Sequence, residues 1–256
     1  MFKEEICKIM KNKLFNKIAG WFGYKLIEKK LHKNNRLIDR FSTLKTESLI
    51  STMFKKNLIS KIVQIGANDG ERFDVLKKFL GRQNIKALLV EPINESFQKL
   101  KLKYADSENI FLENSAISVK NLHNEMYLLN PNFAKLYDDH VPGISSFNKS
   151  HLLKHGVKNK HIIKKKINSI SIKNLLEKHD FLDLDLLYID AEGYDGEILL
   201  DFFNFTNKKP IVIFEYIHIS HNTFYKLLEI LNKNGYKILR ADENLIVINK
   251  EITLEL

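Results

Sequence analysis

A short apolar segment followed by a glycine-rich loop limits most strongly how this chain can fold. Residues 62–65 are typical of a buried strand, and the loop over 66–70 then interrupts the apolar pattern. Apolar residues at helical spacing follow in 73–80, and a second apolar run, 87–90, ends at Glu91. This order predicts a nucleotide-binding half of an α/β sheet, because glycines let a ligand approach the backbone and the acid can accept hydrogen bonds from ribose hydroxyls.

The spacing of the loop argues against a bound phosphate. It is Gly-x-x-x-Gly, whereas the Gly-x-Gly-x-x-Gly loop of dinucleotide sites supplies converging N–H groups for a pyrophosphate. Here an amide and a carboxylate stand where phosphates would lie. A ligand with a ribose and no phosphate, such as S-adenosylmethionine, fits better, and a tight turn without a ligand is the alternative. The cofactor-binding residues predicted here are Gly66, Asn68, Asp69, Gly70 and Glu91.

Composition limits the class of protein. A chain of 256 residues can form one α/β domain with a short extension. Its single cysteine, Cys7, excludes a disulfide framework, and no apolar run reaches the roughly 20 residues of a membrane span. Lysines interrupt the N-terminal region, which therefore lacks the apolar core of a signal peptide. We expect a cytoplasmic protein.

Basic residues are concentrated near the N-terminus. Residues 1–60 hold 14 of the 41 Lys and Arg but only 5 of the 31 Asp and Glu, which leaves 27 basic and 26 acidic residues in the rest of the chain. Apolar residues at roughly helical spacing among the lysines of 1–30 predict a basic amphipathic helix within a helical extension over 1–58. This helix could lie on an anionic membrane surface, but we favour packing of its apolar face against protein.

Strand-like and helix-like segments alternate over the predicted domain, residues 59–250. This alternation predicts an α/β fold with a mostly parallel sheet covered by helices on both faces. The last two strand-like runs, 236–239 and 244–248, are too close in sequence to be parallel and predict a terminal antiparallel hairpin. A run over 126–129 predicts a peripheral strand. Residues 130–167 lose the regular pattern, and we interpret them as a substrate-side cap, because long irregular segments in compact domains are typically functional.

Acidic residues follow predicted strands at the points where the strands end. Asp190 and Glu192 come just after the strand over 184–189, and Glu215 follows the strand over 211–214. In open α/β sheets, ligands bind beyond the carboxyl ends of the strands. These carboxylates could hold an ammonium group, accept a proton from a substrate hydroxyl or bind Mg²⁺. Alternatively, Asp190 caps the following helix.

Histidines accompany these acids. His218 is a candidate general base, although a histidine in a surface turn is equally common. His151 and His155 have the i,i+4 spacing of a zinc site, but the sequence offers no cysteine and no evident third ligand, so we predict no metal there. The predicted catalytic residues are Asp190, Glu192, Glu215 and His218.

Several of these segments resemble the FkbM-type S-adenosylmethionine-dependent methyltransferases. The resemblance covers roughly residues 23–248 and is most specific in the Asp-x-Glu-Gly element. It implies the class I methyltransferase fold, with a seven-stranded sheet, and O-methylation of a sugar, polyketide or related small molecule. The segments that carry it are Gly-Ala-Asn-Asp-Gly at 66–70, Glu-Pro at 91–92, Ser-Ala-Ile-Ser at 115–118, Ser-Ser at 145–146 and Ile-Asp-Ala-Glu-Gly-Tyr-Asp-Gly-Glu-Ile-Leu at 189–199.

The resemblance also implies residue roles. Ser115 and Ala116 would lie near the adenine, the glycine loop would line the rest of the cosubstrate, and Asp190 and Glu192 would lie at the reaction centre. One departure concerns Gln64, because the family usually has an acid at this position. An amide lacks the charge that would hold the methionine ammonium, and we expect Asp190 or Asp69 to supply it.

Two other classes of function stay open. A sequence pI near 9.4 suits a nucleic-acid methyltransferase, but the basic excess lies outside the sheet domain, and no Asn/Asp-Pro-Pro-Tyr-like or Pro-Cys motif follows the fourth strand. A non-catalytic protein could keep the same pocket as a scaffold. We expect a small-molecule or glycan hydroxyl as the methyl acceptor, and no nucleic-acid partner.

Overall fold

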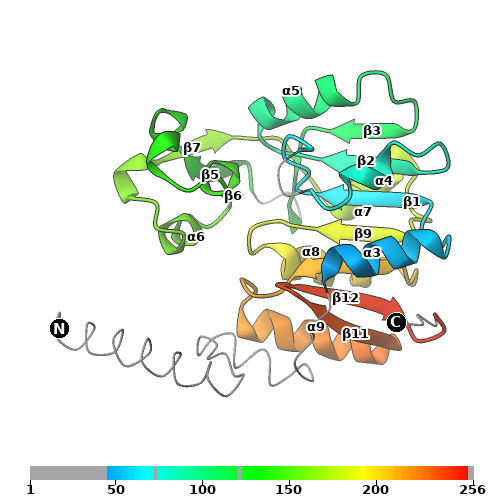
Figure 1. Cartoon of the computed structure of the whole chain (residues 1–256). Coiled ribbons are helices and arrows are strands. Elements are labelled where there is room, and N and C mark those ends of the chain that lie inside the picture. Colours follow the sequence, from blue (N-terminus) through cyan, green and yellow to red (C-terminus); the bar gives the residue numbers. More distant parts are fainter. Residues whose placement is uncertain (1–44, 72–73, 120–122, 253–256) are drawn as a thin grey trace, which may run out of the picture. The chain divides into compact units, whose positions relative to one another are not determined.

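The fold is built around a seven-stranded sheet, seen in a computed structural model that describes residues 45–71, 74–119 and 123–252 (Figure 1). The strand order is β11-β12-β10-β9-β1-β2-β3. Five strands pair in parallel, and β12 runs antiparallel to both of its neighbours. The bounds are β1 (Lys61–Ile65), β2 (Lys86–Val90), β3 (Ile110–Glu113), β9 (Leu186–Ile189), β10 (Ile211–Glu215), β11 (Tyr236–Ala241) and β12 (Asn244–Asn249). The predicted mostly parallel sheet with a terminal antiparallel hairpin is confirmed.

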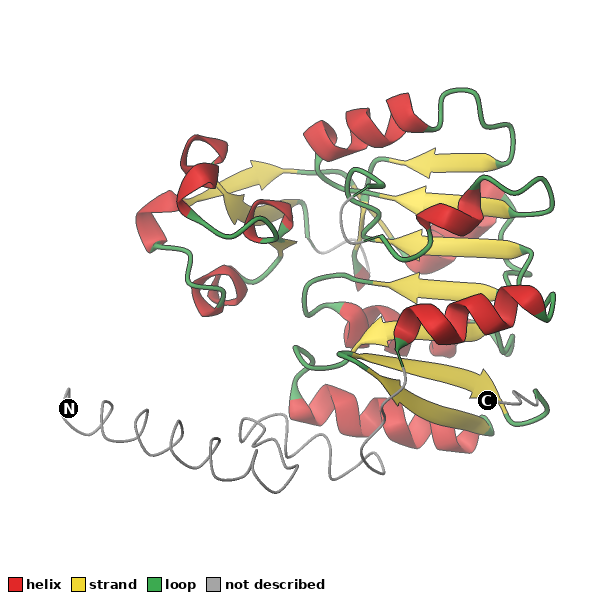
Figure 2. Ribbon diagram, viewed as in Figure 1, coloured by secondary structure: helices red, strands yellow, loops and turns green. Residues whose placement is uncertain are grey.

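Helices cover both faces of this sheet (Figures 1 and 2). One face carries α3 (Thr46–Lys55), α4 (Lys77–Leu80) and α5 (Asn94–Lys103), and the other carries α7 (Ile172–His179), α8 (Asp195–Phe205) and α9 (His221–Lys233). Strands buried on both faces have little contact with water, which explains why the central strands are nearly continuous apolar runs. None of the helices in the described ranges is long and apolar enough to cross a bilayer.

Helix α3 packs with the sheet domain. The compact unit that contains the sheet spans Phe41–Leu256. The division made from the sequence, an extension over 1–58 before a domain over 59–250, stays a prediction. Helix α3 belongs to the domain because Leu49, Ile50 and Met53 are at most 2% exposed and join the apolar core beside the sheet. The predicted basic helix of residues 1–30, with its possible membrane contact, lies outside the described residues.

A small cap with a core of its own interrupts the alternation. Strand β5 (Glu125–Leu129) pairs antiparallel with β6 (Ser145–Ser146) and β7 (Ile162–Lys166). Between these strands lie α6 (Lys149–Lys154) and the 3-10 helices η2 (Pro131–Leu136), η3 (Val141–Gly143) and η4 (Asn159–His161). Five residues form its buried cluster: Leu129, Val141, Ile144, Leu152 and Val157. The segment over 130–167 is thus regular structure in pieces too short to show a period, and β5 belongs to this separate sheet, not to the edge of the main one.

One further pair of strands connects the cap region to the main sheet. Strand β4 (Ala116–Ile117) follows β3 directly and pairs in parallel with β8 (Ser169–Ile170), which follows the cap. The strand that precedes the cap, β4, therefore lies beside the strand that follows it, β8. The cap is therefore an insertion between the third strand and helix α7.

Candidate active site

A cavity of about 530 Å³ opens at the carboxyl ends of the parallel strands. This is the edge at which open α/β sheets bind ligands. Cap residues such as Gly143 and Phe147 form its opposite wall. Most of the predicted site residues line it together: Gly66, Asn68, Glu91, Ser115, Ala116, Asp190, Glu192, Glu215 and His218.

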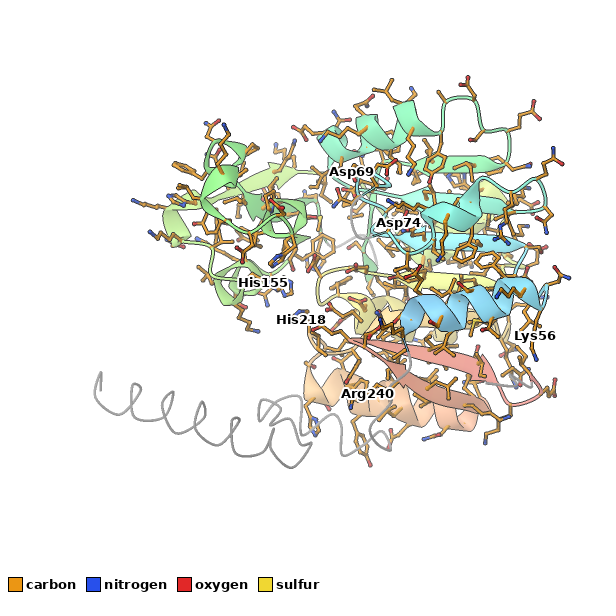
Figure 3. All side chains as sticks on the ribbon, viewed as in Figure 1. Lys56, Asp69, Asp74, His155, His218 and Arg240 are labelled. Atoms are coloured by element: carbon orange, nitrogen blue, oxygen red, sulfur yellow. The ribbon has the colours of Figure 1, made fainter. Side chains whose placement is uncertain are left out.

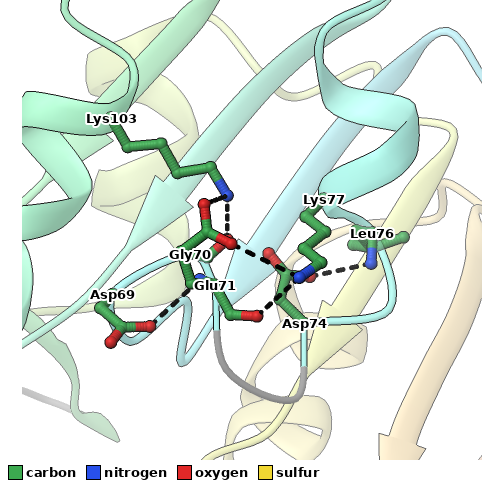
Figure 4. A network of polar contacts seen from close by, with 7 residues as sticks. All are labelled: Asp69, Gly70, Glu71, Asp74, Leu76, Lys77 and Lys103. Carbon is green, nitrogen blue, oxygen red and sulfur yellow. Dashed lines mark hydrogen bonds and ion pairs between the residues drawn. The ribbon is translucent and has the colours of Figure 1, made fainter.

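Asp69 and Gly70, also predicted to bind the cofactor, do not line this cavity. Asp69 Oδ1 accepts a hydrogen bond from the backbone N–H of Glu71 at 3.1 Å, and the Gly70 carbonyl oxygen accepts one from Lys103 Nζ (Figure 4). A Cβ at Gly70 would lie 2.7 Å from Leu100 Cδ1. Gly70 therefore holds the loop against α5, and Asp69 fixes the turn within the loop. The spacing of the glycines does not reveal which loop residues face a ligand, since the path of the backbone decides it.

Gly66 allows β1 and β9 to approach each other at the edge of the cavity. Its φ is +85°, and a Cβ there would lie 2.0 Å from the carbonyl oxygen of Asp190. Asn68 also has a left-handed backbone, with φ +49°, which asparagine tolerates well. The Asn68 Nδ2 atom lies so near the cap that a Cβ at Gly143 would approach it to 2.7 Å. The loop therefore contacts strand β9 on one side and the cap on the other.

The carboxylate of Glu91 is held at the end of β2 by two backbone groups. Its Oε2 accepts a hydrogen bond from the N–H of Asn68 at 2.9 Å, and its Oε1 accepts one from the N–H of Ile93 at 2.8 Å. The residue is 5% exposed, and burial raises the pKa of Glu91 to about 7. Each carboxylate oxygen has a further lone pair, so that the group can still accept a hydrogen bond from a ligand hydroxyl.

Three carboxylates meet on the other side of the cavity. One oxygen from each of Asp190, Glu192 and Glu215 lies within 4.8 Å of the others. Asp190 is exposed to the water of the cavity, but the surrounding protein excludes most bulk solvent and, with Glu192 nearby, raises the pKa of Asp190. Burial and the charge of Asp190 raise the pKa of Glu215 to about 10. Such a group of acids can accept a proton near neutral pH or hold a divalent cation.

The cap fixes the middle member of this group. Glu192 has a left-handed backbone, with φ +51°, a conformation that costs a residue other than glycine about 1–3 kcal/mol. Its carbonyl oxygen accepts a hydrogen bond from Ser146 Oγ at 3.0 Å, and its Oε2 lies 2.8 Å from His151 Nε2. The predicted base His218 lies beside Glu215, with Nε2 3.6 Å from Oε1. Backbone strain held in place by neighbouring contacts is typical of functional positions.

Asp74 is a cavity residue that the sequence analysis missed. Gln64 Nε2 donates a hydrogen bond to Asp74 Oδ1 at 3.2 Å, and both side chains line the cavity. Gln64 Oε1 and Asp74 Oδ2 are buried and have no hydrogen-bond partner among the described residues. We expected Asp190 or Asp69 to supply the charge that Gln64 lacks, but the acid that contacts Gln64 is ten residues farther along the chain. It belongs to no recognisable motif, so only the fold reveals it.

The raised carboxylate pKa values predict that raising the pH from about 5 to about 8 destabilises the protein. Unfolded Asp and Glu ionise near pH 4, whereas Glu91, Asp190, Asp195 and Glu215 keep their protons to higher pH in the folded chain. The folded state therefore binds more protons in this window, and the free energy of unfolding falls as the pH rises. Glu91 alone, raised from 4.5 to about 7, corresponds to a loss of the order of 3 kcal/mol.

Urea unfolding at the two pH values measures this loss, and Asp195→Asn should reduce it. Asp195 is 0% exposed, and its Oδ1 has no partner among the described residues. The control Glu108→Gln changes an exposed acid at the surface and should keep the full pH dependence. Acids with a lowered pKa, such as Glu113, titrate below the window. Stability that increases from about pH 5 to about pH 8 would contradict the prediction.

Several solved methyltransferase structures are similar to this chain. Methyltransferase FkbM from Methylobacillus flagellatus aligns at 17% identity with a TM-score of 0.43, over 74% of this chain and 44% of that one. The O-methyltransferase TomG from Streptomyces achromogenes, solved in complex with S-adenosylmethionine, aligns at 10% identity with a TM-score of 0.43, over 93% of this chain and 98% of that one. A putative caffeoyl-CoA O-methyltransferase from Staphylococcus aureus aligns at 14% identity with a TM-score of 0.41, over the same two shares. This chain thus spans less than half the length of the Methylobacillus protein.

A methyltransferase family model covers most of this chain. No curated protein sequence matches the chain. The Methyltransferase FkbM domain model matches residues 64–238, which is more than half of the chain. The matched range begins in β1, ends in β11 and contains every predicted site residue. The order of the seven strands, with β12 inserted antiparallel between β10 and β11, is that of the class I methyltransferase sheet implied by the resemblance. The chain therefore belongs to the FkbM methyltransferase domain family.

Proposed function

We propose that this protein transfers a methyl group from S-adenosylmethionine to a hydroxyl oxygen of a small molecule or glycan. The observation that supports it most is the charge of the cavity. Six carboxylates line it, and no lysine or arginine of the described residues does. The six are Asp74, Glu91, Asp190, Glu192, Glu215 and Glu243. Such a wall favours a ligand with positive charge and no phosphate, as the sulfonium and ammonium of S-adenosylmethionine require.

Individual residues match the parts of this cofactor. The buried oxygens Gln64 Oε1 and Asp74 Oδ2 offer acceptors for the methionine ammonium, because both line the cavity and have no partner among the described residues. Glu91 would accept hydrogen bonds from the ribose hydroxyls. The buried pair Ser115 and Ala116 follows β3 and would lie along the adenine. The residues present therefore fit the cofactor, with Asp74 replacing the acid that the family usually has at position 64.

Bound S-adenosylmethionine supplies a methyl group that its sulfonium has already activated, and the sulfur keeps the electron pair of the broken C–S bond as the new C–O bond forms. The chain must orient the acceptor and remove its hydroxyl proton. We assign the proton to Asp190, because a carboxylate whose pKa is raised toward neutrality is an effective general base. Glu192 and Glu215 lie beside Asp190, and His218 lies beside Glu215. Mg²⁺ held by the three carboxylate oxygens would lower the pKa of the hydroxyl for the same purpose.

Calorimetric titration of the full chain with S-adenosylmethionine, followed by assays with labelled methyl groups on sugars, glycans and small alcohols, tests the proposal. We expect saturable heat with S-adenosylmethionine and weaker binding of a dinucleotide, whose phosphates would face six carboxylates. A protein that shows no heat and no thermal shift with S-adenosylmethionine would be a scaffold, and the proposal would be wrong. Label that enters RNA instead of hydroxyl compounds would point to the nucleic-acid alternative.

Asp74→Asn should weaken S-adenosylmethionine binding by about 10- to 150-fold, because a hydrogen bond to a charged group contributes about 1.5–3 kcal/mol. Asparagine keeps an oxygen for the N–H of Leu76, which Asp74 Oδ1 accepts at 2.8 Å, so the loop should fold as before. Calorimetry gives the affinity. Asp106→Asn is the matched control, because Asp106 is exposed beyond the end of α5 and outside the cavity. Equal affinities for Asp74→Asn and the unchanged protein would exclude this ammonium site.

A further inference from the structure

Three histidines gather where the cap meets the sheet domain. His151 lies on α6, and His155 follows the last turn of this helix. His218 lies in the loop after β10, and Figure 3 labels it together with His155. One ring nitrogen from each lies within 4.8 Å of the others. The ring centroid of His151 lies 4.6 Å from the centroid of His155 and 4.6 Å from that of His218. The centroids of His155 and His218 are 5.3 Å apart. The sequence offered no third ligand for the pair His151 and His155, and the fold supplies one in His218.

The surroundings of the three rings are those of metal ligands. His155 Nε2 is buried without a hydrogen-bond partner among the described residues, and an orphaned buried nitrogen requires an explanation such as a bound ion. His151 is 5% exposed, and its Nε2 lies 2.8 Å from Glu192 Oε2. Histidines that bind metals usually donate the N–H of their other nitrogen to a carboxylate, which fixes the ring. Glu215 Oε1 lies 3.6 Å from Nε2 of His218, which is longer than a hydrogen bond.

We propose that His151, His155 and His218 together bind one divalent transition-metal ion such as Zn²⁺. Imidazole nitrogens suit zinc and the other late first-row metals, whereas Mg²⁺ and Ca²⁺ prefer oxygen. Nitrogens bound tetrahedrally at about 2.0–2.1 Å lie about 3.4 Å apart. The three ring nitrogens lie within 4.8 Å of one another before an ion draws them together. Three protein ligands leave a fourth position open, as in catalytic zinc sites.

The position of the site suggests what the ion does. His155 and His218 both line the cavity, so the open coordination position is accessible to a ligand in it. The ligand at this position would be a water molecule or the hydroxyl of the methyl acceptor. Assigning the hydroxyl of the acceptor rests on the proposed function. The ion would also join α6 of the cap to the β10–α9 loop, because its ligands come from both. Metal binding should therefore stabilise the cap against the sheet domain.

The test uses the full chain without a polyhistidine tag, treated with chelator and then dialysed, in the absence of S-adenosylmethionine. Zn²⁺ titration by calorimetry should show one ion per chain, and Co²⁺ should give the visible absorption of a tetrahedral nitrogen site. His155→Gln and His218→Gln should each weaken Zn²⁺ binding by at least about tenfold. The matched control is His221→Gln, which changes an exposed histidine three residues beyond His218 and should bind as the unchanged protein does.

Three results would overturn the proposal. The first is no saturable binding of Zn²⁺ or Co²⁺. The second is equal binding in both histidine variants, checked to be folded by circular dichroism. The third is binding that survives the histidine variants and is lost in Glu215→Gln, which would assign the ion to the carboxylates. Calorimetry with S-adenosylmethionine on the same preparation keeps this test separate, because a failure of the metal site leaves cofactor binding unchanged.

Discussion

Replacing Asp190 with asparagine is expected to reduce methyl transfer by about 10²- to 10⁴-fold, the range over which a positioned general base contributes to a rate. Asparagine has nearly the same shape but cannot accept the hydroxyl proton. The backbone N–H of Asp190 bonds the Ile65 carbonyl oxygen at 3.0 Å, and this contact does not depend on the side chain. The variant should therefore fold normally. The assay follows labelled methyl groups on any hydroxyl compound that the unchanged protein methylates.

Asp106→Asn controls for the loss of one negative charge, since its side chain is exposed far from the cavity lining. It should retain full activity. Affinity for S-adenosylmethionine, measured on the same proteins, distinguishes the proposed role of Asp190 as a base from the cofactor contact expected from the sequence. A lower rate with unchanged affinity identifies a base, and a lower affinity identifies a cofactor contact. Unchanged rate together with unchanged affinity would remove Asp190 from the site.

Gly66→Ala is expected to destabilise the protein by at least about 4 kcal/mol, a large part of the stability of an ordinary domain. The added Cβ would lie 2.0 Å from the carbonyl oxygen of Asp190, which belongs to the backbone and cannot rotate away. Residues 62–65 pair with 186–189 just before this point, so the clash would force two central strands apart. The φ of +85° adds a further cost, because residues with a Cβ rarely adopt it.

Urea unfolding and the yield of soluble protein measure this effect. Gly81→Ala is the matched control, since a Cβ at Gly81 meets nothing within 4 Å and its φ is −79°. We expect that variant to stay within about 1 kcal/mol of the unchanged protein. If Gly66→Ala were as stable as the unchanged protein, the fold would not require the close approach of β1 and β9. Contact with a ligand would then be the only reason for a glycine at this position.

The sequence already contained most of the sheet. Apolar runs at 62–65, 87–90, 184–189 and 211–214 are long enough, and buried enough on both faces, to identify β1, β2, β9 and β10. The short segment between the last two strands determined that they are antiparallel. Helical spacing does not reveal what a helix packs against, and only the structure shows that α3 packs on the sheet.

Some residues of the site could be predicted from the sequence, and others could not. Glu91, Asp190 and Glu215 could be placed from the sequence, because a side chain at the carboxyl end of a parallel strand lies at the ligand edge wherever the strand falls in the order. Asp74 and the third histidine could not. Asp74 contacts Gln64 across a loop, and His218 meets His151 and His155 only because the cap folds over the end of β10.

The amino-acid sequence by itself determined the alternation, the acids that end the strands and the family, since each depends on residues close together in the chain. Tertiary structure alone decided which side chains share the cavity: that Asp69 holds a turn, that Asp74 stands beside Gln64, and that three histidines converge. The physical reason is distance along the chain. Contacts between residues tens of positions apart depend on how whole elements pack, and no local period or spacing records that packing.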